Sequence, residues 1–195
     1  AKQPTPGQTK TRLTPPLSAA AAAALYESFL ADTLDLVRRI PGVDHLVAYL
    51  PAEAQAYFRA LAPDFGLVSQ EGVGLGERLD NALAGCLRRG YARAVIMNSD
   101  GPTLPPAYLV QAFAALRDGA EVVLGPSDDG GYYLIGVRQP VPRLLREVRM
   151  STPTVLTDTL ALAAQEGLRV ALLPRWYDID EAADLARLAR ELAES

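Results

Sequence analysis

The sequence is poor in the residue types that many catalytic and structural sites require. Its 195 residues include one cysteine and one histidine, so an internal disulfide is excluded, and a Ser-His-Asp triad or a multi-histidine zinc site is disfavoured. His45 opens a predicted strand, where a surface role is expected. Cys86 shares a helical face with Leu79 and Leu83, which indicates a small core residue rather than a nucleophile. A single cysteine is typical of a reducing cytoplasm, where we expect the protein.

Long apolar runs and strong charge of one sign are also missing. No run approaches the ~20 residues of a membrane span. The net charge is −4, and the basic residues do not cluster in the way that a nucleic-acid footprint requires. We therefore expect neither a membrane span nor a nucleic-acid partner.

The acidic residues, by contrast, fall in a pattern. Three acidic groups each come just after an apolar run that is typical of a buried strand. The groups are Asp100, the pair Asp128 and Asp129, and the pair Asp178 and Asp180. Ligands of open α/β sheets bind at the carboxyl ends of the strands, so we expect these groups to meet on one rim. Gathered carboxylates attract a hard cation, Mg²⁺ or Mn²⁺, which in turn attracts phosphates. The pattern predicts an enzyme that handles a nucleotide through a divalent metal.

Strand and helix signals alternate along the chain. Strands are predicted at 45–50, 65–69, 93–98, 121–125, 132–137 and 169–174, and helices at 19–39, 52–61, 74–89, 106–117, after 151–153 and after 180. Apolar strands in this alternation indicate an α/β fold with a mostly parallel mixed sheet flanked by helices. The strand at 132–137 follows its predecessor too closely for a parallel crossover, so we expect it to be antiparallel. No repeat or linker divides residues 1–195, which predicts a single domain.

Three helix starts carry capping signals. Ser18 is predicted to cap the helix at 19–39. Ser151 or Thr152 is predicted to cap a helix whose first turn holds Pro153. Asp180 is predicted to cap the last helix.

The opening segment is rich in proline and glycine and reads as a loop at residues 3–8. Sheets of this kind usually begin with a strand, so we expect an apolar strand of about five residues to precede Ala1. Lys10 and Arg12 follow the loop, beside the first helix. Paired cations near helix amides make a phosphate cradle; the alternative is two solvated surface cations.

A second glycine-rich turn, at Gly74 and Gly76, opens a helix and permits close approach of a ligand. Arg78 would contact phosphate or base, or else pair with Glu77 or Asp80.

The three acidic turns differ in how strongly their sequences favour a functional role over a purely structural one. Asp100 is followed by Gly-Pro, and the next helix begins too late for Asp100 to cap it, which favours metal binding. Asp128 and Asp129 repel each other unless a cation or hydrogen bonds stabilise both; the alternative is a plain turn. Asp178 and Asp180 lie on one side of an extended segment.

In combination these motifs resemble a bacterial family of GT-A-like proteins that was long known as a domain of unknown function and is often described as glycosyltransferases. The matching segments are 1–7, 10–13, 74–78, 99–102, 128–136, 151–153 and 178–180. The chain is also similar to guanylyltransferases that activate phospholactate or phosphoenolpyruvate, which share a Lys-Thr-Arg-Leu-like opening. The resemblance implies a single GT-A (Rossmann-like) domain of the nucleotide-diphospho-sugar transferase superfamily, a bound nucleotide, and Mg²⁺ or Mn²⁺. One departure is that Asp100 is not part of an Asp-x-Asp motif.

The motifs and the resemblance together predict a role for each site residue. The nucleotide would contact Gly7, Lys10, Arg12, Gly74, Gly76, Arg78 and Ser99. The metal would be held by Asp100, Asp178 and Asp180. The acceptor would contact Gly130, Gly131, Tyr132, Ser151 and Thr152. The catalytic residues would be Lys10, Arg12 and Asp129, the last as general base or acceptor-positioning group.

Three functions stay open at this point. The first is glycosyl transfer from a nucleotide sugar to a small-molecule acceptor. The second is nucleotidyl transfer, in which a phosphorylated small molecule attacks a nucleoside triphosphate and pyrophosphate leaves. The third is a non-catalytic nucleotide-binding module, which would need fewer acidic groups than the chain carries. Exposed strand edges leave a homodimer possible.

Overall fold

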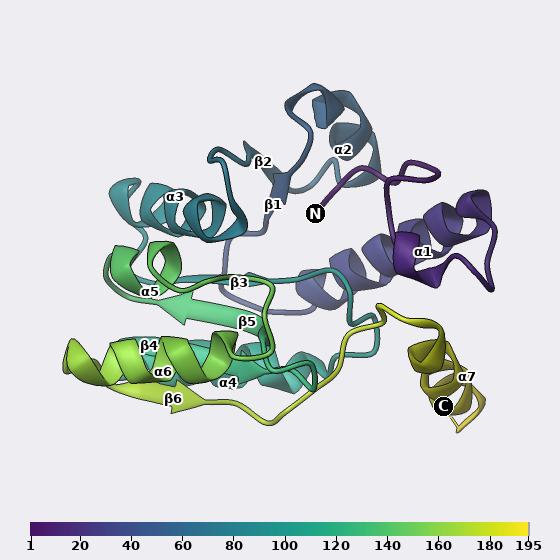
Figure 1. Cartoon of the computed structure of the whole chain (residues 1–195). Coiled ribbons are helices and arrows are strands. Elements are labelled where there is room, and N and C mark those ends of the chain that lie inside the picture. Colours follow the sequence, from purple (N-terminus) through teal and green to yellow (C-terminus); the bar gives the residue numbers. More distant parts are fainter. Residues whose placement is uncertain (195) are drawn as a thin grey trace. The chain divides into compact units, whose positions relative to one another are not determined.

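The computed structural model describes residues 1–194, and Figure 1 labels its helices and strands. The chain divides into two compact units. The first unit comprises residues 1–69, 99–104 and the segment from 178 onward, and the second comprises 70–98 and 105–177. In the described part of the chain, no helix has the length and apolar character needed to cross a membrane.

The first unit contains a long helix and a two-stranded parallel sheet. Its elements are η1 (Thr11–Leu13), α1 (Ala19–Arg38), β1 (Leu46–Tyr49), η2 (Ala52–Ala54), α2 (Gln55–Leu61), β2 (Gly66–Ser69) and α7 (Ala182–Glu194). Strands β1 and β2 pair in parallel, with Leu46 opposite Gly66 at one end and Tyr49 opposite Ser69 at the other. A parallel bridge between Lys2 and Leu50 ties the opening segment to the residue that follows β1.

Helix α1 begins where the sequence predicts, because the hydroxyl of Ser18 accepts a hydrogen bond from the Ala21 N–H at 3.1 Å. One side of the helix is buried and includes the rings of Tyr26 and Phe29. The alanine-rich start of this helix therefore precedes an aromatic face that packs inside the first unit.

The second unit is built on a mixed four-stranded sheet with the order β3-β5-β4-β6. Its elements are α3 (Leu75–Arg88), β3 (Ala94–Met97), α4 (Pro106–Arg117), β4 (Val122–Pro126), β5 (Tyr132–Val137), α5 (Pro142–Arg146), α6 (Val155–Gln165) and β6 (Val170–Leu172). Strand β5 is antiparallel to β3 and β4, and β6 is parallel to β4. Three strands therefore share one direction, and the expected antiparallel strand at 132–137 is confirmed.

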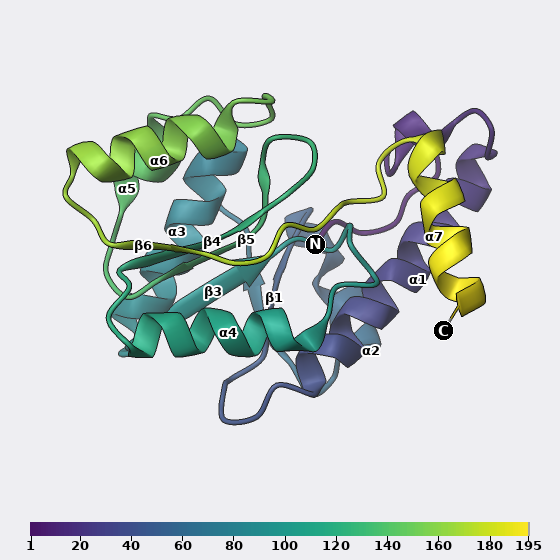
Figure 2. The ribbon, with the colours of Figure 1, turned by 90° about the horizontal axis from the view of Figure 1, so that it is seen from below.

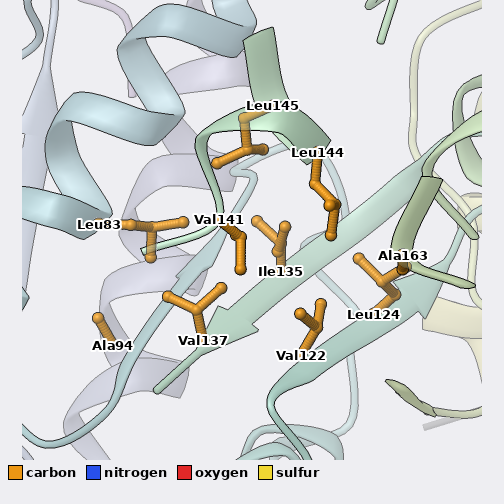
Figure 3. Packing of buried hydrophobic residues seen from close by; sticks show 10 residues of the cluster. All are labelled: Leu83, Ala94, Val122, Leu124, Ile135, Val137, Val141, Leu144, Leu145 and Ala163. Atoms are coloured by element: carbon orange, nitrogen blue, oxygen red, sulfur yellow. The ribbon is translucent and has the colours of Figure 1, made fainter. Parts of the chain in front are cut away.

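Helices cover both faces of this sheet, as Figure 2 shows for α4 on one face and α5 and α6 on the other. The core under α3, α5 and α6 consists of aliphatic side chains from the strands and these helices (Figure 3). Its members are Leu83, Ala94, Val122, Leu124, Ile135, Val137, Val141, Leu144, Leu145 and Ala163. The predicted α/β class, with helices flanking a mixed sheet, is confirmed.

The predicted start of α6 is wrong. The helix begins at Val155, so Pro153 lies outside it, and Thr154 rather than Ser151 or Thr152 occupies the N-cap position. Ser151 adopts a left-handed backbone conformation with φ of 61°. The chain thus turns through 151–153 before the helix begins. The short helix α5 was not predicted at all.

The predicted cap of α7 is also wrong. The carboxylate of Asp184 accepts hydrogen bonds from the N–H groups of Asp180 and Glu181, at 2.9 and 2.7 Å. The Asp180 side chain instead binds two cationic groups, Lys10 and Arg12. Long-range ion pairs therefore hold the carboxylate that the local pattern assigns to the cap, and Asp184 in the first turn of α7 binds the free N–H groups.

Packing of α3 against α5 depends on a glycine. A Cβ added at Gly76 would lie 1.9 Å from the backbone oxygen of Leu145, which cannot move without shifting α5. We expect Gly76→Ala to lower the free energy of unfolding by about 2 kcal/mol. Gly85→Ala in the same helix is the control, because the nearest atom is the end of the flexible Arg88 side chain at 3.9 Å. It should gain up to about 1 kcal/mol. Urea unfolding measures both, and equal effects would contradict the packing argument.

Candidate active site

The backbone of Lys10 is held in an uncommon conformation. Lys10 precedes η1 with φ of 50° and ψ of 42°, a left-handed conformation that costs a non-glycine residue about 1 kcal/mol. The preceding loop is ordered by a hydrogen bond from the Thr5 N–H to the Thr9 hydroxyl at 3.0 Å. Gly7, in the same loop, has φ of 75°. The loop therefore holds the backbone of Lys10 in one defined conformation.

The ammonium of Lys10 meets three oxygen atoms. It forms ion pairs with Asp100 and with Asp180, the latter at 2.9 Å, and donates to the backbone oxygen of Ile179 at 2.8 Å. The Lys10 side chain is only 5% exposed, whereas those of Asp100 and Asp180 are 33% and 30% exposed. Two carboxylates at the surface thus converge on one nearly buried cation.

A backbone contact places the two carboxylates side by side. The Ile179 N–H donates to the backbone carbonyl oxygen of Asp100 at 2.8 Å and joins the segment at 99–104 to the segment at 178–180. Ile179 is fully buried, while Asp178 and Asp180 on either side of it are half-buried. The alternation expected for an extended segment is therefore present, with both acids turned away from the buried isoleucine.

Burial and charge act in opposite directions on Lys10. Burial disfavours the charged ammonium, but the nearby carboxylates of Asp100 and Asp180 outweigh burial and raise the pKa of Lys10 above its ordinary value. The group is therefore a cation at neutral pH.

Arg12 lies at the exposed edge of the same cluster. Its guanidinium pairs with Asp180 at 3.0 Å and with Glu181 at 3.6 Å, and its side chain is 65% exposed. The predicted pair of cations, Lys10 and Arg12, is thus brought together on one carboxylate, that of Asp180. Lys10 is deep in the cluster, and Arg12 lies at its solvent-exposed edge.

Two aromatic rings of α1 complete the cluster and were not predicted. The Lys10 ammonium lies 5.8 Å from the centre of the Tyr26 ring and 5.9 Å from that of Phe29. The Tyr26 hydroxyl is 2.7 Å from the hydroxyl of Ser99. The predicted nucleotide contact of Ser99 stays a prediction. No sequence signal separated Tyr26 from an ordinary core aromatic, because its partners are distant in the chain.

The carboxylates around Lys10 fit a divalent metal that also binds substrate phosphates. Asp100 and Asp180 reach a common cation from two segments, and Mg²⁺ is often held by one or two carboxylates together with substrate phosphates. Within residues 1–194 no group of three or more His, Cys, Asp or Glu side chains is placed to hold a metal by itself. The arrangement thus suits a metal that shares its coordination with a phosphate ligand.

In the second unit, the acidic turn packs against the segment before α6. The Asp129 carboxylate accepts from the Gly131 N–H at 2.9 Å. A Cβ at Gly130 would lie 2.0 Å from the Pro153 oxygen, so only glycine fits. The turn is therefore brought close to the segment that holds Ser151 and Thr152. The Thr152 hydroxyl donates to the Arg149 oxygen at 3.1 Å.

Tyr132 and Gly76 both lie beside Met150. The Tyr132 hydroxyl is 3.8 Å from the Met150 sulfur, and a Cβ at Gly76 would be 3.4 Å from the Met150 methyl group. Burial raises the pKa of Tyr132 to about 12, so its hydroxyl stays protonated at neutral pH and can serve only as a hydrogen-bonding group.

The start of α3 borders a surface hollow of about 410 Å³ that is lined by Gly74, Leu75, Gly76, Glu77, Leu145, Arg146, Val148 and Met150. Glu77 and Asp80 both pair with Arg146. Within residues 1–194, no ion pair joins Arg78 to Glu77 or Asp80, so that alternative is not observed. Among the described residues, the buried Nε of Arg78 has no hydrogen-bond partner.

Cys86 packs beside the core of the second unit, as expected from its helical face. Burial raises the pKa of its thiol, which disfavours the thiolate that a nucleophile requires.

Comparison with solved structures places the fold in a known class. A protein from Desulfovibrio desulfuricans G20, provisionally described as a nucleotide-diphospho-sugar transferase, shares 35% sequence identity with a TM-score of 0.92. The match covers 98% of this chain and 84% of that chain. The fold is that of the nucleotide-diphospho-sugar transferases. The family model described as "Uncharacterized protein conserved in bacteria (DUF2064)" matches residues 33–152, and the chain belongs to this family.

More distant structures share the fold alone. The CTP complex of CMP:2-keto-3-deoxy-manno-octonic acid synthetase is 12% identical with a TM-score of 0.60, over 85% of this chain and 88% of that one. Glucosyl-3-phosphoglycerate synthase from Mycobacterium tuberculosis, solved with Mn²⁺ and UDP, is 17% identical with a TM-score of 0.56, over 78% and 67%. No curated protein sequence matches the chain. The prediction of an enzyme of the transferase class is supported by the match to the D. desulfuricans protein.

The contact between Tyr26 and Ser99 should stabilise the cluster. Both hydroxyls are buried, so we expect Tyr26→Phe to lower the free energy of unfolding by about 1–2 kcal/mol. Tyr57→Phe is the control, since the Tyr57 hydroxyl bonds to Glu27 at an exposed site. It should change stability by less than about 0.5 kcal/mol. A double-mutant cycle of Tyr26→Phe with Ser99→Ala, measured by urea unfolding, should give a coupling free energy near 1 kcal/mol between the two hydroxyls. A coupling of zero would contradict the assigned contact.

Proposed function

We propose that the chain is a metal-assisted transferase that moves a glycosyl group from a nucleotide sugar to a small-molecule acceptor. The observation that carries this proposal is the convergence of Lys10, Arg12, Asp100 and Asp180 on one cluster of alternating charge. Such a cluster supplies both cations for a diphosphate and carboxylates for a metal. The transferase fold shared with the D. desulfuricans protein supports it.

The residues of the first unit would bind the donor. Asp100 and Asp180, with Asp178 beside them, would hold Mg²⁺ or Mn²⁺, which when bound stabilises the charge of a leaving nucleoside diphosphate. Arg12, which is exposed, would make the first contact with the phosphates. Lys10 would neutralise charge deeper in the site. Gly7 would allow the phosphates to approach the backbone of the opening loop.

The residues of the second unit would serve the nucleotide and the acceptor. Gly74, Gly76 and Arg78 would contact the nucleotide. The turn at Gly130 and Gly131, with Tyr132, Ser151 and Thr152, would contact the acceptor. Asp129, whose carboxylate is oriented by the Gly131 N–H, would accept the proton of the attacking hydroxyl. Tyr132 would hydrogen-bond without giving up its proton. The single-domain arrangement, the cytoplasmic location and the homodimer stay predictions.

Nucleotidyl transfer is the second candidate, and one observation favours it. Lys10 and Arg12 both pair with Asp180, and two cations beside a metal site suit the higher charge of a triphosphate. In this reaction a phosphate oxygen of the second substrate would attack the α-phosphate, and pyrophosphate would leave with its electron pair.

The role of Asp100 can be tested by calorimetry. We expect Mn²⁺ to strengthen nucleotide binding, and Asp100→Asn to weaken the metal-dependent part by at least about tenfold, because one of two carboxylates loses its charge. Asp32→Asn on the surface of α1 is the control and should bind like the wild type. If Asp100→Asn keeps the full effect of Mn²⁺, Asp100 is not a metal ligand.

Product analysis separates the two reactions. The protein would be incubated with Mn²⁺ and either a panel of nucleotide sugars or a panel of nucleoside triphosphates, with phosphorylated and hydroxylated small acceptors. Release of nucleoside diphosphate from a nucleotide sugar is the expected result. Release of pyrophosphate from a triphosphate would replace glycosyl transfer by nucleotidyl transfer. Asp129→Asn should slow the observed reaction by at least about a hundredfold if Asp129 is the base.

A further inference from the structure

The Lys10 ammonium has no donor to spare for a phosphate in the arrangement described. An ammonium carries three N–H donors. Within residues 1–194 these face Asp100, Asp180 and the Ile179 oxygen. The predicted contact between Lys10 and a phosphate therefore requires that Lys10 leave at least one of these oxygens. This requirement is the starting point of the inference.

The choice of lysine at this position is informative. The chain has 19 lysines and arginines, of which only Lys2 and Lys10 are lysines. Arginine presents a broad planar fork, whereas the lysine ammonium is a compact point charge on a flexible stem. A compact charge between two carboxylates has the same neighbours that a divalent cation would have there. The Lys10 ammonium thus has the surroundings of a bound metal ion, although it belongs to the chain.

Charge also argues that this arrangement is not the phosphate-binding one. Two carboxylates around one ammonium leave an excess of negative charge beside Arg12, which Asp180 and Glu181 already engage. An anionic ligand gains little there. Replacement of the ammonium by a divalent metal would reverse the sign of the charge and release the ammonium to a phosphate oxygen. Replacement of the ammonium by the metal would thus create both the metal site and the cation that binds the phosphate.

We propose that Lys10 stands in the place of the divalent metal between Asp100 and Asp180, and that metal binding displaces it toward the phosphates of the ligand. This inference rests on the proposed function, since it takes the two carboxylates as metal ligands. Its consequence is that metal and phosphate ligand bind cooperatively, because the phosphate accepts the ammonium that the metal expels. The protein would hold metal weakly until a phosphate ligand is present.

The first test measures Mn²⁺ binding by calorimetry in the absence of nucleotide. Lys10→Met removes the competing charge while keeping a side chain of similar length. It should bind Mn²⁺ on the order of tenfold more tightly than the wild type. Lys2→Met is the matched control, because the Lys2 ammonium contacts only the Gln8 oxygen among described residues, at 3.4 Å, and should leave Mn²⁺ affinity unchanged. Asp100→Asn added to Lys10→Met should abolish the gain.

The second test uses the unaltered chain and does not depend on folding of the variant. Isotope-labelled lysine gives side-chain NMR signals from two residues, which Lys2→Met assigns. Saturating Mg²⁺ should shift the Lys10 Cε signal and leave that of Lys2 in place. Added inorganic pyrophosphate should shift the Lys10 signal further and raise Mg²⁺ affinity.

The outcomes separate this inference from the proposed function. Tighter Mn²⁺ binding by Lys10→Met, with a Mg²⁺-dependent Lys10 signal, supports displacement. If Mn²⁺ strengthens nucleotide binding through Asp100, but Lys10→Met binds Mn²⁺ no more tightly and the Lys10 signal does not move, displacement is wrong and the proposed metal site stands. If neither protein binds Mn²⁺ with or without nucleotide, both proposals fall.

Discussion

The buried positive charge of Lys10 must be balanced, and this requirement holds the first unit together. A cation on a side chain that is 5% exposed is costly unless carboxylates face it. Asp180, 170 residues further along the chain, and Asp100 meet this need. Their segments are joined by the backbone bond between Ile179 and Asp100. The rings of Tyr26 and Phe29 line the remaining side. The opening loop, α1 and two distant segments therefore depend on one charge.

Elements that are defined by local pattern could be predicted closely. The helix at 106–117 and the strand at 132–137 have the expected bounds, because Pro106 marks the first turn and the short connection after β4 forces β5 to be antiparallel.

Features set by distant contacts could not be predicted. The local pattern assigns Asp180 to the cap of α7, but its carboxylate pairs with Lys10 and Arg12 instead. The start of α6 is displaced because Gly130 packs on Pro153, a contact that no local propensity encodes. Tyr26 sits on the buried face of an alanine-rich helix, where an aromatic residue usually only fills the core. Its link to Ser99 spans 73 residues.

The contrast in exposure between the two cations has a consequence for ionic strength. Salt screens charges in solvent over about 8–10 Å but reaches buried pairs much less. Arg12, with 65% of its side chain exposed, is open to this screening, whereas Lys10 is sheltered from it. Rising salt would therefore weaken the capture of an anion at the rim while leaving the inner charge balance intact. The cluster is thus divided into a salt-sensitive outer cation and a salt-resistant inner one.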